Sequence, residues 1–503
     1  MAARDTFDVI IVGGGTAGCV VARRLAERGD RSVLLLEAGP DLGAEPPPAL
    51  RDGWSLPSGP RWPYDWGFES EPGASGATGV LRRGRVLGGT SWLTRFALRG
   101  AAEDFDAWAG RGNPGWTFED VLPTFKAIEA DQEFGDRSWH GDHGPIPITR
   151  YPEHERSEIH ATTLAAFESV GFETVEDHNG PGAIGAGPMP MSTRRGERVT
   201  ALDAYLPPTA SLPGLTIRAE TLVASIVIEA GRATAVRLAD GAEIRTAGIV
   251  LCAGVYSSPS ILLRSGIGPA ARLAALGIDV RVDLPGVGEN LADHPGVDLD
   301  SGWRGTTTTG PILHSIATFR SSMAPPRGAP DLMFWVTDPD GDEPRFSLDP
   351  VLLKPRSRGS VQLRSADPTD PPRITLPGLR EPPDIERLAE GYARGIELAN
   401  RPEIRHLALE APPSAPGSLA AFRRRVIDNA YSIPHVVGTC RMGPVPGAGD
   451  VVDTLGRVHG VEGLSVIDAS IIPDAPSGFP HLITIMLAEH LAARAFEGWP
   501  ISR

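Results

Sequence analysis

The chain has 503 residues, of which 41% are hydrophobic and 22% charged, and its formal net charge is −15 at pH 7. Two domains are expected, because single hydrophobic cores rarely grow beyond about 300 residues. The acidic balance argues against a nucleic-acid partner. No uncharged apolar run reaches the roughly 18 residues that a membrane span needs. The composition is therefore that of an ordinary globular protein.

The cysteines and the N-terminal residues predict a cytoplasmic location. Cys19, Cys252 and Cys440 lie far apart in no metal-ligand spacing, and three cysteines cannot form a disulfide framework. Free thiols fit a reducing compartment. The first residues, Met-Ala-Ala-Arg-Asp-Thr, lack the apolar core of a signal peptide.

Residues 7–39 have the pattern of a dinucleotide-binding βαβ unit. The apolar run Val9–Val12 predicts a strand buried on both faces of a parallel sheet, and it leads directly into Gly13-x-Gly15-x-x-Gly18. Gly13 permits a tight turn, Gly15 lets the backbone approach a pyrophosphate, and Gly18 lets the next helix pack closely on its strand.

The rest of the unit follows in the expected order. A helical pattern continues to about Arg28, and a second apolar run, Val33–Leu36, ends in Glu37. The helix N-terminus would offer free N–H groups and a positive dipole end to the phosphates. Glu37 is placed to accept hydrogen bonds from an adenosine ribose. The complete unit predicts a bound dinucleotide.

Further elements are predicted along the chain. Residues 40–80, rich in Pro, Gly and Trp, predict an extended excursion over the cofactor, and helical spacing predicts helix between Phe105 and Glu129. Asp240-Gly241 predicts a hairpin turn. Strand patterns occur at Leu215–Arg218, Val223–Ile228, Ala233–Leu238, Gly248–Gly254 and Leu332–Val336. A loop is expected at Thr306–Thr309, an amphipathic helix at 384–400 and a long helix at Thr484–Phe496.

Several longer motifs identify a family. They are Asp65-Trp66-Gly67-Phe68, Arg83-Gly84-Arg85-Val86-Leu87-Gly88-Gly89-Thr90-Ser91, Gly254-Val255-Tyr256-Ser257-Ser258-Pro259, Gly286-Val287-Gly288-x-Asn290-Leu291-x-Asp293-His294, His435-x-x-Gly438-Thr439-x-x-Met442-Gly443 and Asp468-Ala469-Ser470. In these motifs and their order the chain resembles the glucose–methanol–choline (GMC) family of FAD-dependent oxidoreductases, almost from end to end. Bacterial alcohol oxidases and choline-type dehydrogenases are the most similar subgroups.

The resemblance implies a fold of the α/β class. A Rossmann-like FAD-binding domain built from discontinuous segments is expected beside an α+β substrate-binding domain with an antiparallel sheet. The FAD-binding segments would be 1–155, 196–297 and 432–503, and the substrate-domain segments 156–195 and 298–431.

The resemblance also implies the FAD contacts. The expected cofactor-binding residues are Gly13, Gly15, Thr16, Ala17, Gly18, Glu37, Ala38, Arg83, Val86, Gly88, Gly89, Thr90, Thr94, Val223, Ala253, Gly254, Asp468, Ala469, His481 and Leu482. The asparagine that usually touches the flavin is replaced here by Leu93 or Thr94. Trp92 or Leu93 occupies the position where some members attach FAD through histidine, so non-covalent FAD is expected.

Two histidines carry the expected chemistry. Oxidising an alcohol by hydride transfer requires removal of the hydroxyl proton, and histidine suits that task because its ordinary pKa is about 6.5. His435 and His481 stand at the two positions that flank the substrate hydroxyl in the family. We assign His435 as the general base and His481 as its hydrogen-bonding partner. The predicted reaction is oxidation of a primary alcohol to an aldehyde, with oxygen or another carrier as electron acceptor.

Other interpretations of these residues are weaker. His140, His143 and His154 match no metal-ligand spacing, so no metal site is expected, and His294 is interpreted as structural. The substrate pocket is expected to involve Trp303, Phe334 and Trp335, while Trp92 and Arg95 would either reach it or fill the core.

Two alternative functions stay open. The chain could be a lyase that retains FAD without using its redox chemistry, as hydroxynitrile lyases of this fold do, or it could be a light-driven decarboxylase.

Overall fold

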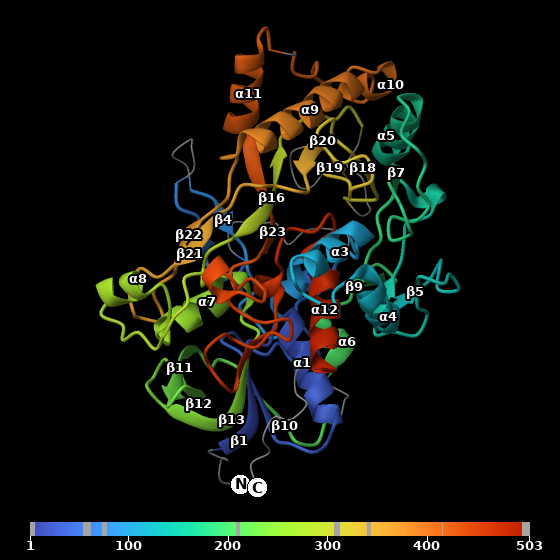
Figure 1. Ribbon diagram of the computed structural model, residues 1–503. Helices are drawn as coiled ribbons and strands as arrows, with labels where there is room; N and C mark the ends of the chain where they lie inside the picture. Colours follow the sequence, from blue (N-terminus) through green and yellow to red (C-terminus); the bar gives the residue numbers. More distant parts are fainter. Residues whose placement is uncertain are drawn as a thin grey trace.

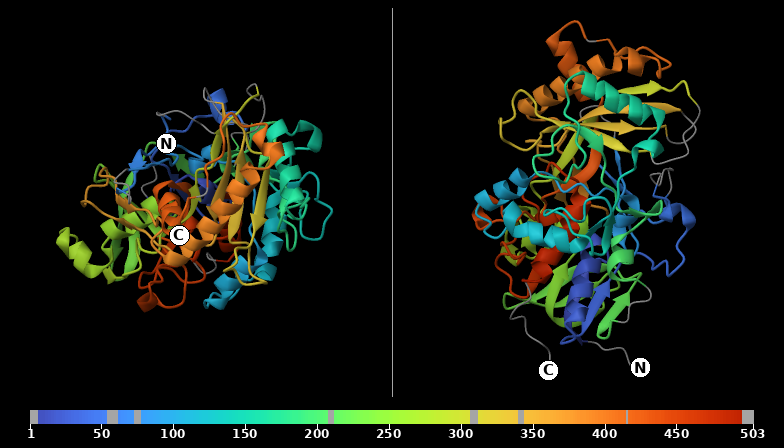
Figure 2. Two further views of the ribbon diagram at one scale, coloured as in Figure 1. Left: turned by 90° about the horizontal axis from the view of Figure 1, so that it is seen from above. Right: turned by 90° about the vertical axis from the view of Figure 1, so that its right-hand side faces the viewer.

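Two seven-stranded sheets organise the protein. The computed structural model describes residues 6–53, 62–72, 78–207, 212–305, 312–339, 344–414 and 416–494. In two views at right angles the sheets lie towards opposite ends of the molecule, with β1 and β10–β13 at one end and β18–β20 at the other (Figures 1 and 2). The predicted combination of a Rossmann-like sheet with an antiparallel sheet is confirmed.

The first sheet is mainly parallel and contains the N-terminal βαβ unit. Its strands, in spatial order, are β10 (Leu215–Arg218), β2 (Val33–Leu36), β1 (Thr6–Val12), β13 (Glu243–Leu251), β12 (Arg232–Leu238) and β11 (Val223–Glu229), with β24 (Leu464–Val466) also paired to β13. All of β2, and all of β1 after Thr6, is buried. This two-sided burial explains the uninterrupted apolar runs in the sequence.

The second sheet is antiparallel throughout. Its strands, in spatial order, are β23 (Ala430–Val437), β16 (Ala292–Val297), β20 (Arg345–Leu352), β19 (Leu332–Thr337), β18 (Ser315–Phe319) and β7 (Ala186–Pro188), with β17 (Asp300–Gly302) also paired to β20. The strand predicted at 332–336 is β19. The hairpin turn predicted at Asp240-Gly241 joins β12 to β13, and Gly241 has a φ of 89° there.

Helices pack on both sheets. Helix α1 (Thr16–Glu27) lies against α12 (Pro480–Ala492) below the level of the second sheet, and α9 (Pro382–Ala399) packs on β19 and β20 (Figure 1). The other helices are α2 (Pro48–Arg51), α3 (Ala102–Gly110), α4 (Phe118–Ile128), α5 (Glu158–Ser169), α6 (Ala201–Tyr205), α7 (Gly254–Arg264), α8 (Ala270–Ala275), α10 (Pro402–Arg405) and α11 (Leu419–Asp428), with 3-10 turns at Gly89–Leu93, Glu153–Glu155, Pro446–Ala448 and Ala469–Ile471. The remaining strands form small sheets: β3 (Phe68–Glu69), β4 (Val80–Leu81), β5 (Glu129–Asp131), β6 (Ile146–Ile148), β8 (Thr193–Arg194), β9 (Glu197–Arg198), β14 (Ile267–Gly268), β15 (Val282–Asp283), β21 (Ser360–Gln362) and β22 (Arg373–Thr375).

Two helix predictions need correction. The predicted helical stretch from Phe105 to Glu129 is two helices, α3 and α4, because Gly115 has a φ of 84° and Thr117 caps α4 by accepting a hydrogen bond from Asp120 N–H. The last helix begins at Pro480, earlier than predicted, since proline fits the first helical position. The loop predicted at 306–309 and the helix end at 496 lie outside the described residues.

The domain boundaries remain a prediction. Strand β16 pairs in the second sheet although residues 292–297 fall in a predicted FAD-binding segment, and β23 crosses the predicted boundary between 431 and 432. These two strands place residues from both predicted domains side by side.

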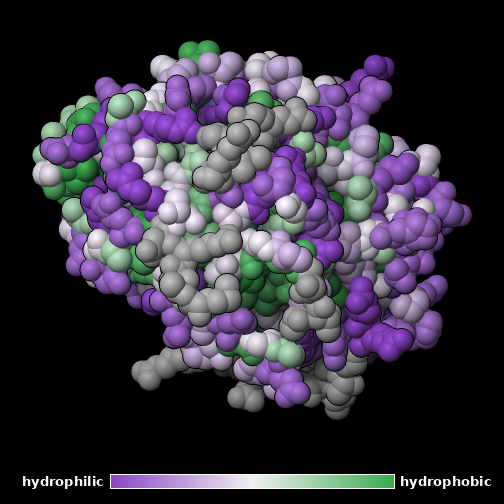
Figure 3. All heavy atoms as spheres, turned by 90° about the horizontal axis from the view of Figure 1, so that it is seen from below, coloured by the Kyte–Doolittle hydropathy of each residue, from purple (hydrophilic) through white to green (hydrophobic). Residues whose placement is uncertain are grey.

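Hydrophilic residues predominate on one face of the molecule. The face seen from below in Figure 3 is mainly hydrophilic, with hydrophobic side chains exposed near its centre. Within the described part of the chain, no helix is both long and apolar enough to cross a membrane.

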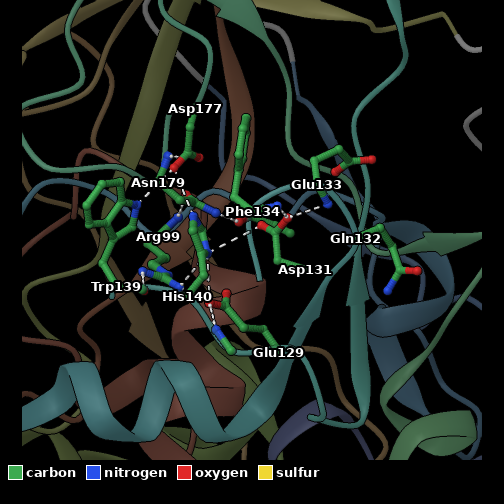
Figure 4. A network of polar contacts seen from close by, with 12 residues as sticks. Arg99, Glu129, Asp131, Gln132, Glu133, Phe134, Trp139, His140, Asp177 and Asn179 are labelled. Atoms are coloured by element: carbon green, nitrogen blue, oxygen red, sulfur yellow. Dashed lines mark hydrogen bonds and ion pairs between the residues drawn. The ribbon is translucent and has the colours of Figure 1, made fainter. Parts of the chain in front are cut away.

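A buried ionic network ties the segment after α4 to the rest of the molecule (Figure 4). His140 Nδ1 lies 2.9 Å from Glu129 Oε1, and its Nε2 lies 2.8 Å from Asp177 Oδ2. Arg99 pairs with Glu129, and Arg150 donates to both Asp131 and Asp177. His140 is thus held by carboxylates and arginines, which supports a structural role.

The network favours protonated His140. Burial opposes the charge, but hydrogen bonds to Asp177 and Glu129 outweigh it and raise the pKa of His140 above 6.5. A group whose pKa is raised on folding stabilises the fold most below its unfolded pKa, and that contribution is lost as pH rises through the folded pKa.

We therefore expect His140→Gln to lower stability more at pH 6 than at pH 9. Loss of the buried partner should lower the free energy of unfolding by about 3–5 kcal/mol at pH 6. Urea midpoints of the variant and the parent at both pH values measure the difference. His143→Gln is the control, because that side chain is 90% exposed. An equal effect of His140→Gln at both pH values would contradict the proposed charge state.

Candidate active site

One long cavity brings together the dinucleotide-binding turn and both predicted catalytic histidines. The expected cofactor residues that line it are Gly13, Gly15, Thr16, Ala17, Glu37, Ala38, Arg83, Gly89, Thr90, Thr94, Val223, Ala253, Gly254, Asp468, Ala469 and His481. His435 lines it as well. The other expected residues, Gly18, Val86, Gly88 and Leu482, are not among the lining residues. A Cβ on Gly18 would meet the Gly13 carbonyl oxygen at 1.9 Å, so Gly18 serves close helix–strand packing.

The glycines bring two backbone segments close together at the start of α1. Gly89 has a φ of 54°, and a Cβ on it would lie 2.6 Å from the Gly15 Cα. A Cβ on Gly13, with a φ of 99°, would lie 2.6 Å from the Cys252 carbonyl oxygen. Side chains at these positions are therefore excluded, and bare backbone forms this part of the cavity.

Helix α1 begins at the cavity without a side-chain cap. Gly15 is its N-cap residue, no side chain accepts from the first N–H groups, and the first turn contains no acidic residue. The unpaired N–H groups and the positive end of the helix dipole suit a bound anion such as a diphosphate.

Glu37 shapes the neighbouring part of the cavity. Its Oε2 accepts a hydrogen bond of 2.8 Å from Gly14 N–H, and its Oε1 accepts one of 2.8 Å from Gly39 N–H. Burial raises the pKa of Glu37, although these N–H groups act in the opposite direction. Val223, another expected cofactor-binding residue, lines the same cavity.

Asp468 fixes the start of α7 next to the cavity. Its Oδ2 accepts hydrogen bonds from Gly254 N–H at 2.9 Å and from Ser258 Oγ at 2.6 Å, while Oδ1 accepts from Ser470 N–H at 2.8 Å. Both oxygens of the Asp468 carboxylate thus accept hydrogen bonds from other residues of the protein. The neighbouring Ala469 also lines the cavity.

At the other end of the cavity, His435 on β23 contacts a third histidine that the sequence analysis interpreted as structural. His294 on β16 places its Nδ1 3.1 Å from Nδ1 of His435, and its Nε2 lies 3.0 Å from the carbonyl oxygen of Pro476. The Asp-His pair at 293–294 was visible in the sequence, but its closeness to His435 depends on the pairing of β16 with β23.

These contacts determine the tautomers. A carbonyl oxygen can only accept, so Nε2 of His294 carries the hydrogen, and Nδ1 of a neutral His294 is an acceptor. Nδ1 of His435 must then be the donor, which leaves Nε2 of a neutral His435 without a proton. Nε2 is therefore the nitrogen of His435 that can take a proton from a ligand.

The surroundings keep all three histidines neutral. Burial lowers the pKa of His294 and of His481 to about 4 each. Burial, followed by the effects of His294 and Arg83, lowers the pKa of His435 well below 6.5. Nε2 of His481 has no hydrogen-bond partner among the described residues. It therefore has a free position for a bound hydroxyl.

Asp293 holds the backbone of both strands in place. Its Oδ1 accepts hydrogen bonds of 2.9 Å from the N–H groups of His294 and His435, and its Oδ2 accepts from Ser432 Oγ. One carboxylate thereby fixes the relative position of the two histidines.

Aromatic side chains surround His435. The centroid of the Phe479 ring lies 4.4 Å from that of His435, and the Trp335 ring lies 6.4 Å from it. Phe96 packs edge-on against both Phe479 and Trp335. These rings form an aromatic wall beside His435, in which Phe479 lines the cavity while Phe96 and Trp335 pack behind it.

The expected pocket residues need correction. Trp335 lies beside His435, but Phe334 points to the opposite face of β19, where it packs on Phe319, because neighbouring strand residues alternate between faces. Trp303 belongs to the same distant core cluster.

The residues of the altered first signature, 92–95, have different environments. Trp92 is buried and donates from Nε1 to the Leu87 carbonyl oxygen at 2.9 Å, so it fills the core and does not line the cavity. Arg95 is buried as well. Of the two residues expected in place of the family's asparagine, Thr94 lines the cavity and Leu93 is not among its lining residues. Which of them replaces the asparagine stays a prediction.

Comparison with known proteins decides the family. Two family profiles described as GMC oxidoreductase match this chain, over residues 7–296 and 355–488. The chain belongs to the GMC oxidoreductase family. It is 35% identical to 5-(hydroxymethyl)furfural oxidase from Methylovorus sp. (strain MP688), over 97% of this chain and 98% of that one.

Two further relatives agree with this assignment. Oxygen-dependent choline dehydrogenase from Sinorhizobium fredii is 33% identical over 99% of this chain and 96% of its own length. The crystal structure of pyridoxine 4-oxidase from Mesorbium loti superposes with a TM-score of 0.90 at 31% identity, covering 97% of this chain and 99% of that one. The GMC protein described here is an FAD-dependent oxidoreductase that acts on alcohols.

The cavity fits FAD. Bare glycine backbone and the uncapped α1 terminus suit the diphosphate. Helix α12 also begins at the cavity without a side-chain cap or an acidic residue in its first turn. Its positive end would favour negative charge on the flavin.

Gly15→Ala tests the diphosphate position. A Cβ there would meet only the Gly89 Cα, at an ordinary contact of 3.8 Å, so the apoprotein should keep its thermal stability. The same methyl group would face the cofactor and should weaken FAD binding about 10–100-fold. Flavin absorbance per chain and the melting temperature of the apoprotein measure the two effects. Gly110→Ala, at an open helical position, is the control. Full FAD occupancy at limiting FAD in Gly15→Ala would contradict the assignment.

Proposed function

We propose that this GMC enzyme oxidises a primary alcohol to an aldehyde, with His435 as the base. The observation that carries the proposal is the hydrogen-bond chain from the Pro476 carbonyl through His294 to His435, which leaves Nε2 of His435 as a proton acceptor. A neutral imidazole with a fixed tautomer is what general-base catalysis requires.

In the proposed reaction, the hydroxyl proton moves to Nε2 of His435. The free Nε2 of His481 supports a hydrogen bond to the same hydroxyl oxygen. Bound FAD supplies the acceptor for the hydride that leaves the carbinol carbon. The alcohol thereby loses one proton and one hydride and becomes an aldehyde. We further propose that FAD is bound without a covalent link, since Trp92 is buried in the core.

The aromatic wall supports an alcohol group attached to a planar ring. Phe479 lines the cavity beside His435, and Phe96 and Trp335 hold its ring in place by packing against it. The acidic residues that line the described cavity are Glu37, Asp370 and Asp468, and each carboxylate already accepts hydrogen bonds from the protein. The described cavity therefore favours a neutral aromatic alcohol over a quaternary ammonium alcohol.

Anaerobic stopped-flow absorbance with a panel of alcohols tests the proposal. Benzyl and furfuryl alcohol should reduce the flavin faster than cyclohexylmethanol or choline, because only the first two have a planar ring that can stack on Phe479. His435→Ala should slow this reduction about 10²–10⁴-fold while FAD stays bound. Since only neutral His435 is active and its pKa is lowered, the rate should not fall as pH drops to 6.5.

A control variant and the flavin reduction rate of His435→Ala test the assignment of the base. His154→Ala should leave the rate unchanged, because that side chain is 80% exposed. Near-normal reduction in His435→Ala would overturn the base assignment.

If no alcohol reduces fully loaded flavin, a lyase or a light-driven decarboxylase replaces alcohol oxidation as the proposed function. Admission of oxygen after reduction shows whether oxygen is the electron acceptor, as the name of the choline dehydrogenase relative supports.

His294 is proposed as the positioning residue for His435. Gln at this position can accept from Nδ1 of His435 and donate to the Pro476 carbonyl, whereas Leu can do neither. His294→Leu should slow flavin reduction on the order of 10²-fold, and His294→Gln should restore most of the rate. Flavin content and melting temperature are measured alongside. Equal rates in the two variants would contradict the tautomer argument.

A further inference from the structure

Three side chains of types that can bind a metal ion come from distant parts of the sequence and lie close together away from the FAD cavity. His160 lies in the first turns of α5, His314 directly precedes β18, and Asp338 directly follows β19. One nitrogen or oxygen atom from each side chain lies within 4.8 Å of the other two. The residues are at most 2% exposed.

The atoms are too far apart for direct hydrogen bonds but well spaced for a shared ion. His160 Nε2 lies 3.6 Å from Asp338 Oδ1, and His314 Nε2 lies 3.8 Å from Asp338 Oδ2. Ligand atoms bound at about 2.1 Å to a tetrahedral zinc ion lie about 3.4 Å apart. Small movements of the side chains would close the remaining difference.

His160 is oriented as metal-binding histidines are. Its Nδ1 is hydrogen-bonded to Ser315 Oγ at 2.7 Å, and its Nε2 has no hydrogen-bond partner among the described residues. This unpartnered nitrogen is fully buried and faces Asp338. Asp338 Oδ1 in turn accepts from Ser157 Oγ at 2.8 Å. Hydrogen bonds of this kind hold ligands in position around metals.

We propose that His160, His314 and Asp338 bind one divalent transition-metal ion. Two imidazoles and one carboxylate suit zinc, and a water molecule would complete four-coordination. The site departs from the expectation of no metal, because spacing along the sequence cannot reveal ligands from three separate segments.

The metal would have a structural role. It would join α5 to the ends of β18 and β19. The neighbouring Ile312 and Leu313 belong to the same buried cluster as Phe96 and Phe479, so the fixed segment lies behind the aromatic wall. The inference does not depend on the proposed alcohol oxidation.

Metal analysis of the tag-free holoenzyme tests the site. Protein grown with added zinc should contain one zinc ion per chain by plasma mass spectrometry. Removal of the metal with a chelator should lower the melting temperature by at least about 2 °C, and adding Zn²⁺ back should restore it. Absence of bound metal together with no response to Zn²⁺ overturns the proposal.

Variants locate the ion. Asp338→Asn and His160→Gln should each lower zinc content at least about fivefold and remove the response of the melting temperature to Zn²⁺. The double variant His143→Gln/His154→Gln, in which both original side chains are at least 80% exposed, should keep both. Zinc retained in Asp338→Asn and His160→Gln but lost in the double variant would overturn the proposed site. Should both site variants fail to fold, the chelator and Zn²⁺ titration of the parent decides.

Discussion

The main physical requirement on this cavity is to stabilise negatively charged groups that are removed from water. Helices α1 and α12 begin at its wall with neither a side-chain cap nor an acidic residue in the first turn. The short helices α2 and α8 also lack both features, whereas α3, α4, α5, α6 and α9 each have an acidic residue in the first turn. The helices that face the cavity thus leave their N-terminal N–H groups and positive dipole ends for the cofactor, although a local acid would stabilise each helix on its own.

The same electrostatic environment sets the state of the histidines. Burial, supported by positive charge on Arg83 for His435 and on Arg198 for His481, disfavours their protonation. A neutral imidazole can accept a proton from a ligand. In the proposed reaction two tasks are therefore separate: helix ends and arginines stabilise anions, while neutral imidazoles take part in the proton transfer.

Local patterns predicted local structure well and distant contacts poorly. The run Val33–Leu36 matches β2 because a strand buried on both faces must be apolar throughout. The break between α3 and α4 was missed because the apolar spacing continues past Gly115. Motifs indicated His435 and His481, but the contact of His294 with His435 depends on strand pairing between residues 141 positions apart. Likewise, only the register of β19 decides that Trp335 and not Phe334 faces the base.

The pairing of β16 with β23 brings His294 next to His435 at the cavity that contains the glycine turn. The proposed base, His435, and its proposed positioning residue, His294, lie on the second sheet, whereas the glycine turn and α1 are next to the first. Asp293 fixes His294 and His435 through their backbone N–H groups, so the base stays in register even where neighbouring wall residues differ. The wall residues Phe96 and Trp335 take no part in these hydrogen bonds to Asp293. Their side chains can therefore change the position of the cavity-lining Phe479 without altering the tautomer of His435.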